Sequence, residues 1–471
     1  MAMADQARSW AEKTFGKASL GDERRTARLV AIAAQLARTP GGAVSHVFTE
    51  DAARQGAYDF LESDGIGVGA IISAMTGAGS SACSAEQRVL VAVDGSSLTL
   101  VDRGDTKDFG AIGDYAHGGR GIKVISALAM TETTGVPLGL LHQEWWTRPK
   151  AKPQLSAKKK RARAVDETET QRWIDAINGS ASELKRCAPN TRAWFQIDRE
   201  GDSTPILLAL KATEHDFTVR GNWDRKVEQK LGTLRRNLTY SADRGSYELR
   251  VSGSSKRTAR TATMSVSYAK VSVKLKDPAT GAPVSLAVTA VLAREISTPP
   301  AGEERIDWLL LTNVAVATID DALAVIAGYA KRWRIEEFHK TWKSGACNVE
   351  QTQLRSVEAV LRWATVSACV AVRIERLKRL SRTEPTLPAT AELTALEIRV
   401  LTALKKRRRR KNESLPCTPT ISDVTRWIAE LGGYTGKSSG GPPGATVLRR
   451  GLDRLQAAVE GAVALGLDED T

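Results

Sequence analysis

Three acidic residues that lie far apart in the chain stand where their side chains could meet. Asp94 ends the apolar run RVLVAVD, Asp198 ends RAWFQID, and Glu336 lies in the segment YAKRWRIEEFHKTWKSG. Each aspartate alone could simply close a buried strand. Together, two carboxylates on neighbouring strands and a third on a helix beside them could hold two Mg²⁺ ions about 4 Å apart, with Mn²⁺ as a substitute. Such a pair of ions assists the cleavage of a phosphodiester by binding the attacking and leaving oxygens.

The segment that contains Glu336 gathers polar groups along one line. At about 100° per residue, a single helix would place five of them within an arc of roughly 80°, namely Tyr329, Arg332, Glu336, Lys340 and Lys343. The opposite side would pack through Ile335, Phe338 and Trp342. The cations could neutralise phosphate oxygens beside a metal, and the tyrosine hydroxyl could hydrogen-bond one. The alternative is a solvated helix face whose charges pair with one another.

The elements that must position these residues occur in the order of an RNase H-like core. Three strand-like runs, RVLVAVD, IKVISALAMTE and VPLGLLHQEWW, precede a helix over about residues 167–185. The strand that ends at Asp198, the helix STPILLALKATE and the strand DFTVRG follow. This order predicts an α/β fold, with acids at the ends of the first and fourth strands.

The whole chain divides into three predicted domains. Residues 1–80 read as a basic helical domain, which the family resemblance described below assigns to DNA-end binding, residues 81–350 as the RNase H-like core, and residues 351–471 as a helical C-terminal domain. Strand-like sequence over about residues 222–313 predicts a β-rich insertion in the core. Thr318 and Asp321 form a capping-box pattern before the Glu336 helix, and Gly345 stands where that helix should end.

The composition favours a globular protein with an acidic partner. The chain has 471 residues, 42% of them hydrophobic, a formal charge of +14 and a pI near 9.6. Nucleic acid is the commonest large acidic partner, although charge alone decides little. The apolar runs are too short to span a bilayer, and the N-terminus does not read as a secretory signal, so we expect a cytoplasmic protein. Five scattered cysteines predict free thiols rather than a disulfide framework or a zinc site.

Two further groups of basic residues could contact DNA phosphates. Arg24, Arg25 and Arg28 lie on the first turns of the helical stretch SLGDERRTARLVAIAAQLAR, and the run KKRRRRKN covers residues 405–412. For both groups, a solvated surface is the alternative interpretation.

The segment YAKRWRIEEFHKTWKSG resembles the signature helix of the bacterial cut-and-paste DDE transposases of insertion-sequence group four. Within that group it is most similar to the hairpin-forming transposases of composite transposons. The similarity continues along nearly the whole chain through SLGDERRTARLV, QGAYDF, GLLHQEWW with RP after it, DRE, DWLLLT, AVRI and LGGY. Coincidence is not credible over this length. The resemblance implies that Asp94, Asp198 and Glu336 are the metal-binding triad, and that Tyr329, Arg332, Glu336 and Lys343 match the Tyr, Arg, Glu, Lys signature of the family.

The resemblance also implies DNA-binding roles outside the triad. Trp308 of DWLLLT corresponds to the tryptophan that stacks on a base flipped out of the transposon end, and Trp333 lies beside that pocket. An aromatic face can offset the few kcal/mol that unstacking one base costs. Lys340, Arg199 and Arg220 are further candidates for contacts with DNA.

A reaction and an assembly follow from the same resemblance. At one site, a strand is nicked, the freed 3′ hydroxyl forms a hairpin, water reopens the hairpin, and the ends join target DNA without a covalent enzyme intermediate. Two chains form a synaptic complex with double-stranded transposon ends, and each core acts on the end that the other chain's N-terminal domain binds. This arrangement would assign Arg24, Arg25 and Arg28 to end recognition and the C-terminal helices to pairing, in a protein that associates with the nucleoid when it binds DNA. The GSS after Asp94 and the basic linker KAKPQLSAKKKRARA leave the end sequence and the target preference open.

Two other interpretations compete with a transposase. An RNase H-like nuclease would cut DNA without joining it, so supplying pre-cleaved ends with target DNA and Mg²⁺ separates the two enzymes. A non-catalytic DNA-binding inhibitor, such as a shortened family member, would do neither. The complete triad and signature helix argue against the inhibitor.

Overall fold

The structure is a computed structural model of the chain. It describes residues 6–104, 106–115, 118–154, 156, 164–241, 244–251, 253, 257–408, 414–436 and 441–466. Most of the basic linker singled out above, and residues 409–412 of the basic run, lie outside these described residues.

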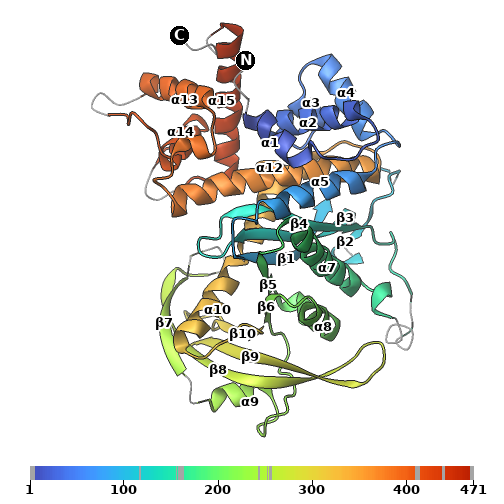
Figure 1. Ribbon diagram of the computed structural model, residues 1–471, viewed down its shortest axis with the longest axis vertical. Helices are drawn as coiled ribbons and strands as arrows, with labels where there is room; N and C mark the ends of the chain where they lie inside the picture. Colours follow the sequence, from blue (N-terminus) through green and yellow to red (C-terminus); the bar gives the residue numbers. More distant parts are fainter. Residues whose placement is uncertain are drawn as a thin grey trace.

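One mixed sheet runs through the centre of the described part of the chain (Figure 1). Its strands follow the order β2-β3-β1-β5-β6-β10-β9-β8-β7, and β4 pairs with β3. The strands are β1 (Arg88–Thr99), β2 (Gly110–Ile112), β3 (Gly119–Thr131), β4 (Pro137–Trp146), β5 (Arg192–Ile197), β6 (Asp216–Arg220), β7 (Arg244–Val251), β8 (Arg260–Lys276), β9 (Pro283–Glu295) and β10 (Asp307–Thr312).

The pairing of the first strands has the topology of an RNase H-like core. β1, β3 and β4 form an antiparallel meander, since β3 pairs with β1 on one side and with β4 on the other. β5 then pairs with β1 in parallel, and β6 pairs with β5 in parallel. The predicted fold class is therefore confirmed.

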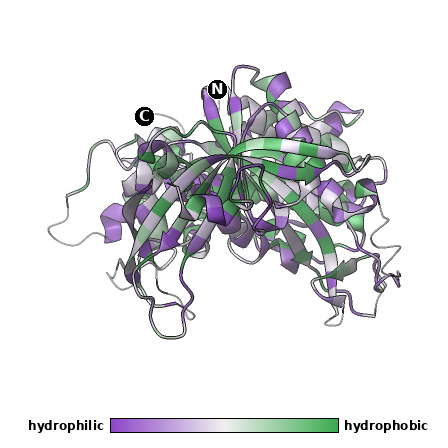
Figure 2. Cartoon of the chain, turned by 90° about the horizontal axis from the view of Figure 1, so that it is seen from below, coloured by the Kyte–Doolittle hydropathy of each residue, from purple (hydrophilic) through white to green (hydrophobic). Residues whose placement is uncertain are grey.

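The β-rich insertion continues the same sheet rather than forming a separate body. β10 pairs antiparallel with β6 and with β9, and β8 pairs with β9 and β7. Along β8, hydrophobic residues alternate with polar ones. The middle of β9 is buried on both faces, since Val291 and Ala293 belong to one core and Ala290 and Leu292 to the other. Figure 2 shows hydrophobic and hydrophilic residues interleaved along the strands.

Helices cover both faces of the sheet and form the top of the molecule in Figure 1. The N-terminal and core helices are α1 (Gln6–Phe15), α2 (Glu23–Arg38), α3 (Val44–Val47), α4 (Asp51–Leu61), α5 (Val68–Ser81), α7 (Glu169–Cys187), α8 (Thr204–Ala212) and α9 (Leu234–Thr239). The later helices are α10 (Ile319–Lys331), α11 (Arg334–Lys343), α12 (Val357–Thr383), α13 (Ala395–Arg408), α14 (Ile421–Leu431) and α15 (Ala445–Ala464). Short 3₁₀ turns are η2 (Val165–Glu167), η3 (Arg199–Gly201), η4 (Val349–Gln351) and η5 (Ala389–Ala391).

Each face of the sheet contributes to its own buried core. Val89, Val91 and Val93 of β1 pack with α7 and α8. Leu90 and Ala92 of the same strand belong to the core that includes α5, α10, α11, α12 and the N-terminal helices. The N-terminal helices therefore share a hydrophobic core with the central sheet and α10–α12.

The single helix predicted over residues 329–345 is wrong, because the structure divides it into α10 and α11. At the junction, Arg332 N donates to Tyr329 O at 2.9 Å and Ile335 N donates to Arg332 O at 3.0 Å. These are bonds of the 3₁₀ type, which tighten the chain and bend its path. The capping box of Thr318 and Asp321 is present at the start of α10, and α11 ends at Lys343, two residues before Gly345.

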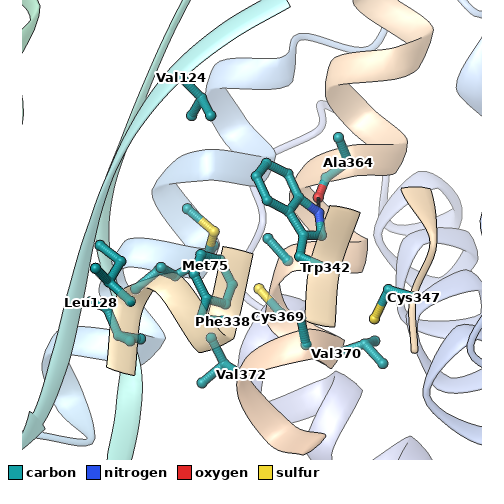
Figure 3. Close-up of a cluster of buried hydrophobic side chains, with 14 of the residues drawn as sticks. Met75, Val124, Leu128, Phe338, Trp342, Cys347, Ala364, Cys369, Val370 and Val372 are labelled. Carbon is teal, nitrogen blue, oxygen red and sulfur yellow. Dashed lines mark hydrogen bonds between the residues drawn. The ribbon is translucent and has the colours of Figure 1, made fainter. Parts of the chain in front are cut away.

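The apolar side of α11 anchors this helix in the core as predicted. Phe338 and Trp342 are fully buried and stack with their ring centroids 5.7 Å apart. Trp342 Nε1 donates to Ala364 O of α12 at 3.0 Å, the contact drawn in Figure 3. Burial on one side and a hydrogen bond to α12 fix the rotation of α11 about its axis.

Two expectations from composition can be compared with the structure. All five cysteines are free thiols. No helix among the described residues combines the length and apolar character needed to cross a membrane.

Gly328 lets α10 lie directly on the sheet, and this contact is testable. A Cβ at this position would lie 2.7 Å from Cη2 of Trp194, whose Nε1 is held by Thr218 Oγ1 at 2.9 Å. We expect Gly328→Ala to lower the free energy of unfolding by about 1–3 kcal/mol, because the ring cannot yield freely. Gly461→Ala is the matched control, since Gly461 lies within α15 with no atom within 4 Å of a new Cβ, and it should stabilise by up to about 1 kcal/mol. Denaturant unfolding measures both, and an unchanged midpoint for Gly328→Ala would contradict the close contact.

Candidate active site

Strand register carries two of the predicted acids to one face of the sheet. The last parallel pairs between β1, β5 and β6 are formed by Val93, Ile197 and Val219. The next residues along these strands are Asp94, Asp198 and Arg220. Because side chains alternate along a strand, these three residues belong to the face opposite the valines, which α10 and α11 cover.

Arg332 lies among the acidic side chains at the junction of α10 and α11. Its Nη2 donates to Glu336 Oε1 at 2.6 Å, and its Nη1 lies 3.6 Å from Asp94 Oδ1. Burial alone would lower the pKa of Arg332, but the charges of Asp94, Asp198 and Glu336 outweigh it, and the net pKa is raised. The predicted triad and Arg332 therefore form one electrostatic unit.

Asp94 is the most strongly perturbed member of this unit. Burial raises its pKa to about 7; the positive charge of Arg332 opposes the rise, and the charges of Asp198 and Glu336 add to it. Its side chain is only 14% exposed. A carboxyl group in this state is short of positive charge, so a further cation beside it would favour its ionised form.

Asp198 is held by the turn that follows β5. Its carboxylate caps η3 by accepting a hydrogen bond from Glu200 N at 2.8 Å. Arg199 follows it at the surface of the same turn. The short 3₁₀ turn thus fixes the carboxylate directly after the strand.

Sequence analysis missed His339, which lies one turn after Glu336 on the inner side of α11. Its Nδ1 is 3.7 Å from Asp94 Oδ2, and burial lowers its pKa to about 3, so the imidazole is neutral. A histidine on an apolar helix face reads as a core residue. The one available signal was its spacing of three residues from Glu336, which places the two side chains on neighbouring parts of one helix surface.

Trp308 and Tyr329 form an aromatic pair beside the acids. Their ring centroids are 5.8 Å apart at 71°, and the Arg220 guanidinium lies 6.0 Å from the Trp308 centroid. Arg332 lies 5.9 Å from the Tyr329 ring. The Tyr329 hydroxyl is protonated at neutral pH and can donate, since burial raises its pKa further above the ordinary value of 10.0. Two rings bordered by two guanidinium groups can receive both a base and a phosphate.

The remaining candidates on α11 and at its start lie nearer the surface. Trp333, at the junction before α11, is 58% exposed, and Lys340 is also exposed. Lys343 Nζ lies 3.8 Å from Glu350 Oε1, and that carboxylate also accepts from Thr99 N at 2.8 Å. Lys343 is therefore held near the end of β1, the strand that carries Asp94.

The three arginines of the N-terminal region lie elsewhere, on α2 among the helices at the top of Figure 1. Arg24 and Arg28 are exposed. Arg25 instead donates to Leu20 O at 3.3 Å and to Gly65 O at 2.9 Å. Part of the hydrogen-bonding capacity of Arg25 is thus used within the fold, and a DNA contact by these arginines stays a prediction.

Comparison with protein families gives three matches along the chain. Residues 7–66 match the transposase DNA-binding model, and residues 156–373 match the transposase DDE domain. Residues 369–467 match the transposase Tn5 dimerisation domain. Asp198 and Glu336 lie inside the DDE match, whereas Asp94 lies before it.

A DDE domain implies dependence on a divalent cation, typically Mg²⁺. Within the described ranges, no three His, Cys, Asp or Glu side chains are already arranged to hold a metal ion. The donor set still fits such an ion, because carboxylate oxygens are the ligands that Mg²⁺ prefers, and a cation bound beside the buried Asp94 would offset the burial that raises its pKa. Asp94, Asp198 and Glu336 are the residues that would hold it.

The raised pKa of Asp94 predicts how stability depends on pH. Because the folded protein binds this proton more tightly than the unfolded chain does, its unfolding free energy should fall as pH rises from the ordinary value of 3.8 through about 7. The Asp94→Asn variant has no carboxyl group to ionise at this position, so it should not lose stability in this way. Its unfolding free energy at pH 8 in EDTA should exceed that of the parent by about 1–3 kcal/mol. Denaturant titrations at pH 5 and pH 8 measure the difference. Glu183→Gln, which alters an acid on α7, is the control, and a less stable Asp94→Asn at pH 8 would contradict the assignment.

Proposed function

The chain is a DDE transposase that cleaves DNA and transfers its strands, and we propose that it moves a transposon by a complete cut-and-paste reaction. The proposed steps are nicking, hairpin formation, hairpin resolution and strand transfer into target DNA, all at one site. This route is that of the hairpin-forming members of insertion-sequence group four, which the chain resembles in sequence. One observation carries the proposal: the carboxylates of Asp94 and Glu336 approach one buried arginine, and Asp198 is near enough for its charge to act on both Asp94 and Arg332.

In this proposal, Asp94, Asp198 and Glu336 hold two Mg²⁺ ions at each active site. When bound, the ions supply Lewis-acid activation of the attacking and leaving oxygens. Arg332 and Lys343 provide positive charge for phosphate oxygens, and they are held beside β1 through Asp94 and Glu350. The protonated hydroxyl of Tyr329 donates a hydrogen bond to a phosphate oxygen.

The aromatic pair supports the hairpin step of the proposal. A hairpin bends DNA sharply, and a base that leaves the stack needs a new surface. Trp308 offers its ring between Tyr329 and Arg220, and its partial exposure leaves part of that ring open. Trp333, Lys340 and Arg199 are exposed and are proposed as further contacts along the same DNA.

The assembly in the proposal is a homodimer that binds two transposon ends. The DNA-binding match assigns the N-terminal helices to DNA, and the dimerisation match assigns the C-terminal helices to pairing. We assign residues 1–80, 81–350 and 351–471 to end binding, catalysis and pairing. Each core would act on the end held by the other chain, with Arg24, Arg25 and Arg28 contributing to end binding, and the complex would reside at the nucleoid.

Selection of bound sequences from random DNA, followed by cleavage of the selected duplexes, tests the function and supplies the end sequence. In that assay, Asp198→Ala should reduce strand cleavage on the order of 10³-fold or more, because a metal ligand is lost, while end binding is kept. Glu183→Ala, a surface acid in the same core, should retain both activities. Strand transfer is measured with pre-cleaved ends and target DNA in Mg²⁺. Cleavage that survives Asp198→Ala unchanged would refute the site assignment.

Trp308→Ala separates the hairpin step from nicking. Loss of one base-stacking surface should slow hairpin formation by roughly 5- to 150-fold, whereas nicking should survive better, since it needs no flipped base. Trp308→Phe keeps an aromatic face and should restore much of the difference. Gel assays that resolve nicked and hairpin products give both rates, and equal loss of the two would count against base stacking.

A further inference from the structure

Trp223 is a large aromatic residue that the fold presents to solvent. It lies in the short loop that follows β6 and is 61% exposed. Tryptophan is normally well buried, because its ring carries a large apolar area. The exposure of Trp223 in the active-site region of the fold therefore calls for an explanation.

A buried aspartate holds the loop around Trp223 in one conformation. The Asp202 side chain is fully buried, and its Oδ2 accepts from Asn222 N at 2.7 Å and from Trp223 N at 3.1 Å. Its Oδ1 accepts from Arg225 Nε at 2.9 Å and from Arg225 Nη2 at 2.7 Å. Two backbone groups and one guanidinium thus converge on a single carboxylate. Such an arrangement orders the loop before any ligand arrives, which lowers the entropic cost of binding.

The same loop connects two parts of the active site. Asp202 lies four residues after Asp198, and its N–H donates to Arg199 O within the turn that Asp198 caps. On the other side, Gly221 N donates to Leu309 O at 2.6 Å, so the loop begins beside the strand that carries Trp308. Trp223 is therefore positioned at the edge of the sheet where the acids and Trp308 also lie.

The charges near Trp223 favour a nucleic acid as its partner. Lys226 is exposed three residues after Trp223, and Arg199 is exposed in the turn that Asp202 links to the Trp223 loop, while Arg225 is bound to Asp202. Asp224 is the acidic neighbour, and its carboxylate accepts from Arg235 N at 2.8 Å. An exposed aromatic ring with basic neighbours is the usual composition of a surface that stacks bases and contacts phosphates.

We propose that Trp223 is a second base-stacking surface, which takes an unstacked base of the transposon end next to the cleavage point. This proposal rests on the proposed cut-and-paste function. The backbone of the Trp223 loop begins beside β10, the strand that carries Trp308, and the Asp202 bonds hold the Trp223 backbone there in the free protein. Trp308 and Trp223 together would contact two parts of the same DNA end.

The effect on DNA binding is measured with Trp223→Ala, Trp223→Phe and the control Tyr240→Ala. The probe is a fluorescent pre-cleaved duplex with the end sequence selected from random DNA. Trp223→Ala should weaken binding roughly tenfold, within the range that one base stack supports, and Trp223→Phe should restore most of it. Tyr240 is 71% exposed at the end of α9, so Tyr240→Ala tests the loss of an exposed ring elsewhere and should leave binding unchanged. Equal melting temperatures establish that the variants are folded.

Photochemical crosslinking identifies the contact directly. Trypsin should release residues 221–225 as the peptide GNWDR, in which Trp223 is the one aromatic residue. A duplex with 5-iododeoxyuridine beside the cleavage point should crosslink to this peptide. Crosslinks confined to other peptides, together with unchanged binding by Trp223→Ala, would overturn the proposal. If Trp223→Ala keeps its affinity for the duplex but two chains no longer pair on DNA, Trp223 contacts protein rather than DNA. That result would also overturn the proposal.

The two proposals can fail separately. If the parent protein forms no hairpin, the cut-and-paste function fails whatever Trp223 contacts. If the parent forms hairpins and Trp223→Ala binds and cleaves equally well, only the second stacking surface is refuted.

Discussion

The site depends on one constraint: three negatively charged side chains converge at one face of the sheet. Asp94, Asp198 and Glu336 come from three different elements, and the fold brings their charges together. Where burial and mutual repulsion act together, the pKa of Asp94 rises to about 7 even with Arg332 3.6 Å away. Burial therefore outweighs the stabilisation that Arg332 gives to the ionised carboxylate. A site of this kind favours the binding of divalent cations and of the phosphate chemistry that they support.

Helix α12 supports both the active site and the N-terminal helices. It is 27 residues long, so it spans about 40 Å, and it runs beneath the N-terminal and C-terminal helices in Figure 1. Arg362 donates to Leu61 O and to Ile66 O of the N-terminal region, and Trp363 Nε1 donates to Gly42 O at 2.7 Å. One residue further along, Ala364 O accepts from Trp342 of α11. The helix that fixes Glu336 is thus braced by the same segment that holds the DNA-binding helices.

The parts of the site that sequence predicted are those with a local signal. An apolar run closed by an acid marks Asp94 and Asp198, and strand alternation then places them on one face once β1 and β5 are paired. The break between α10 and α11 has no such signal, because the junction residues Arg332 and Trp333 are neither glycine nor proline. Only the packing of the two helices against different surfaces requires the break. His339 was missed for a similar reason, since its nearness to Asp94 comes from a contact between α11 and β1. The continuation of the sheet into β7–β9 also depends on pairings between distant strands, which composition does not reveal.

The central claim is that the carboxylates of Asp94, Asp198 and Glu336 together hold the metal ions that act on DNA. Crystals of the protein with a pre-cleaved transposon end, soaked in Mn²⁺ and measured at the manganese absorption edge, test this claim most directly. The account predicts anomalous peaks in contact with the carboxylates of Asp94, Asp198 and Glu336. Peaks bound to other residues, with any of these three acids turned away from the scissile phosphate, would contradict it.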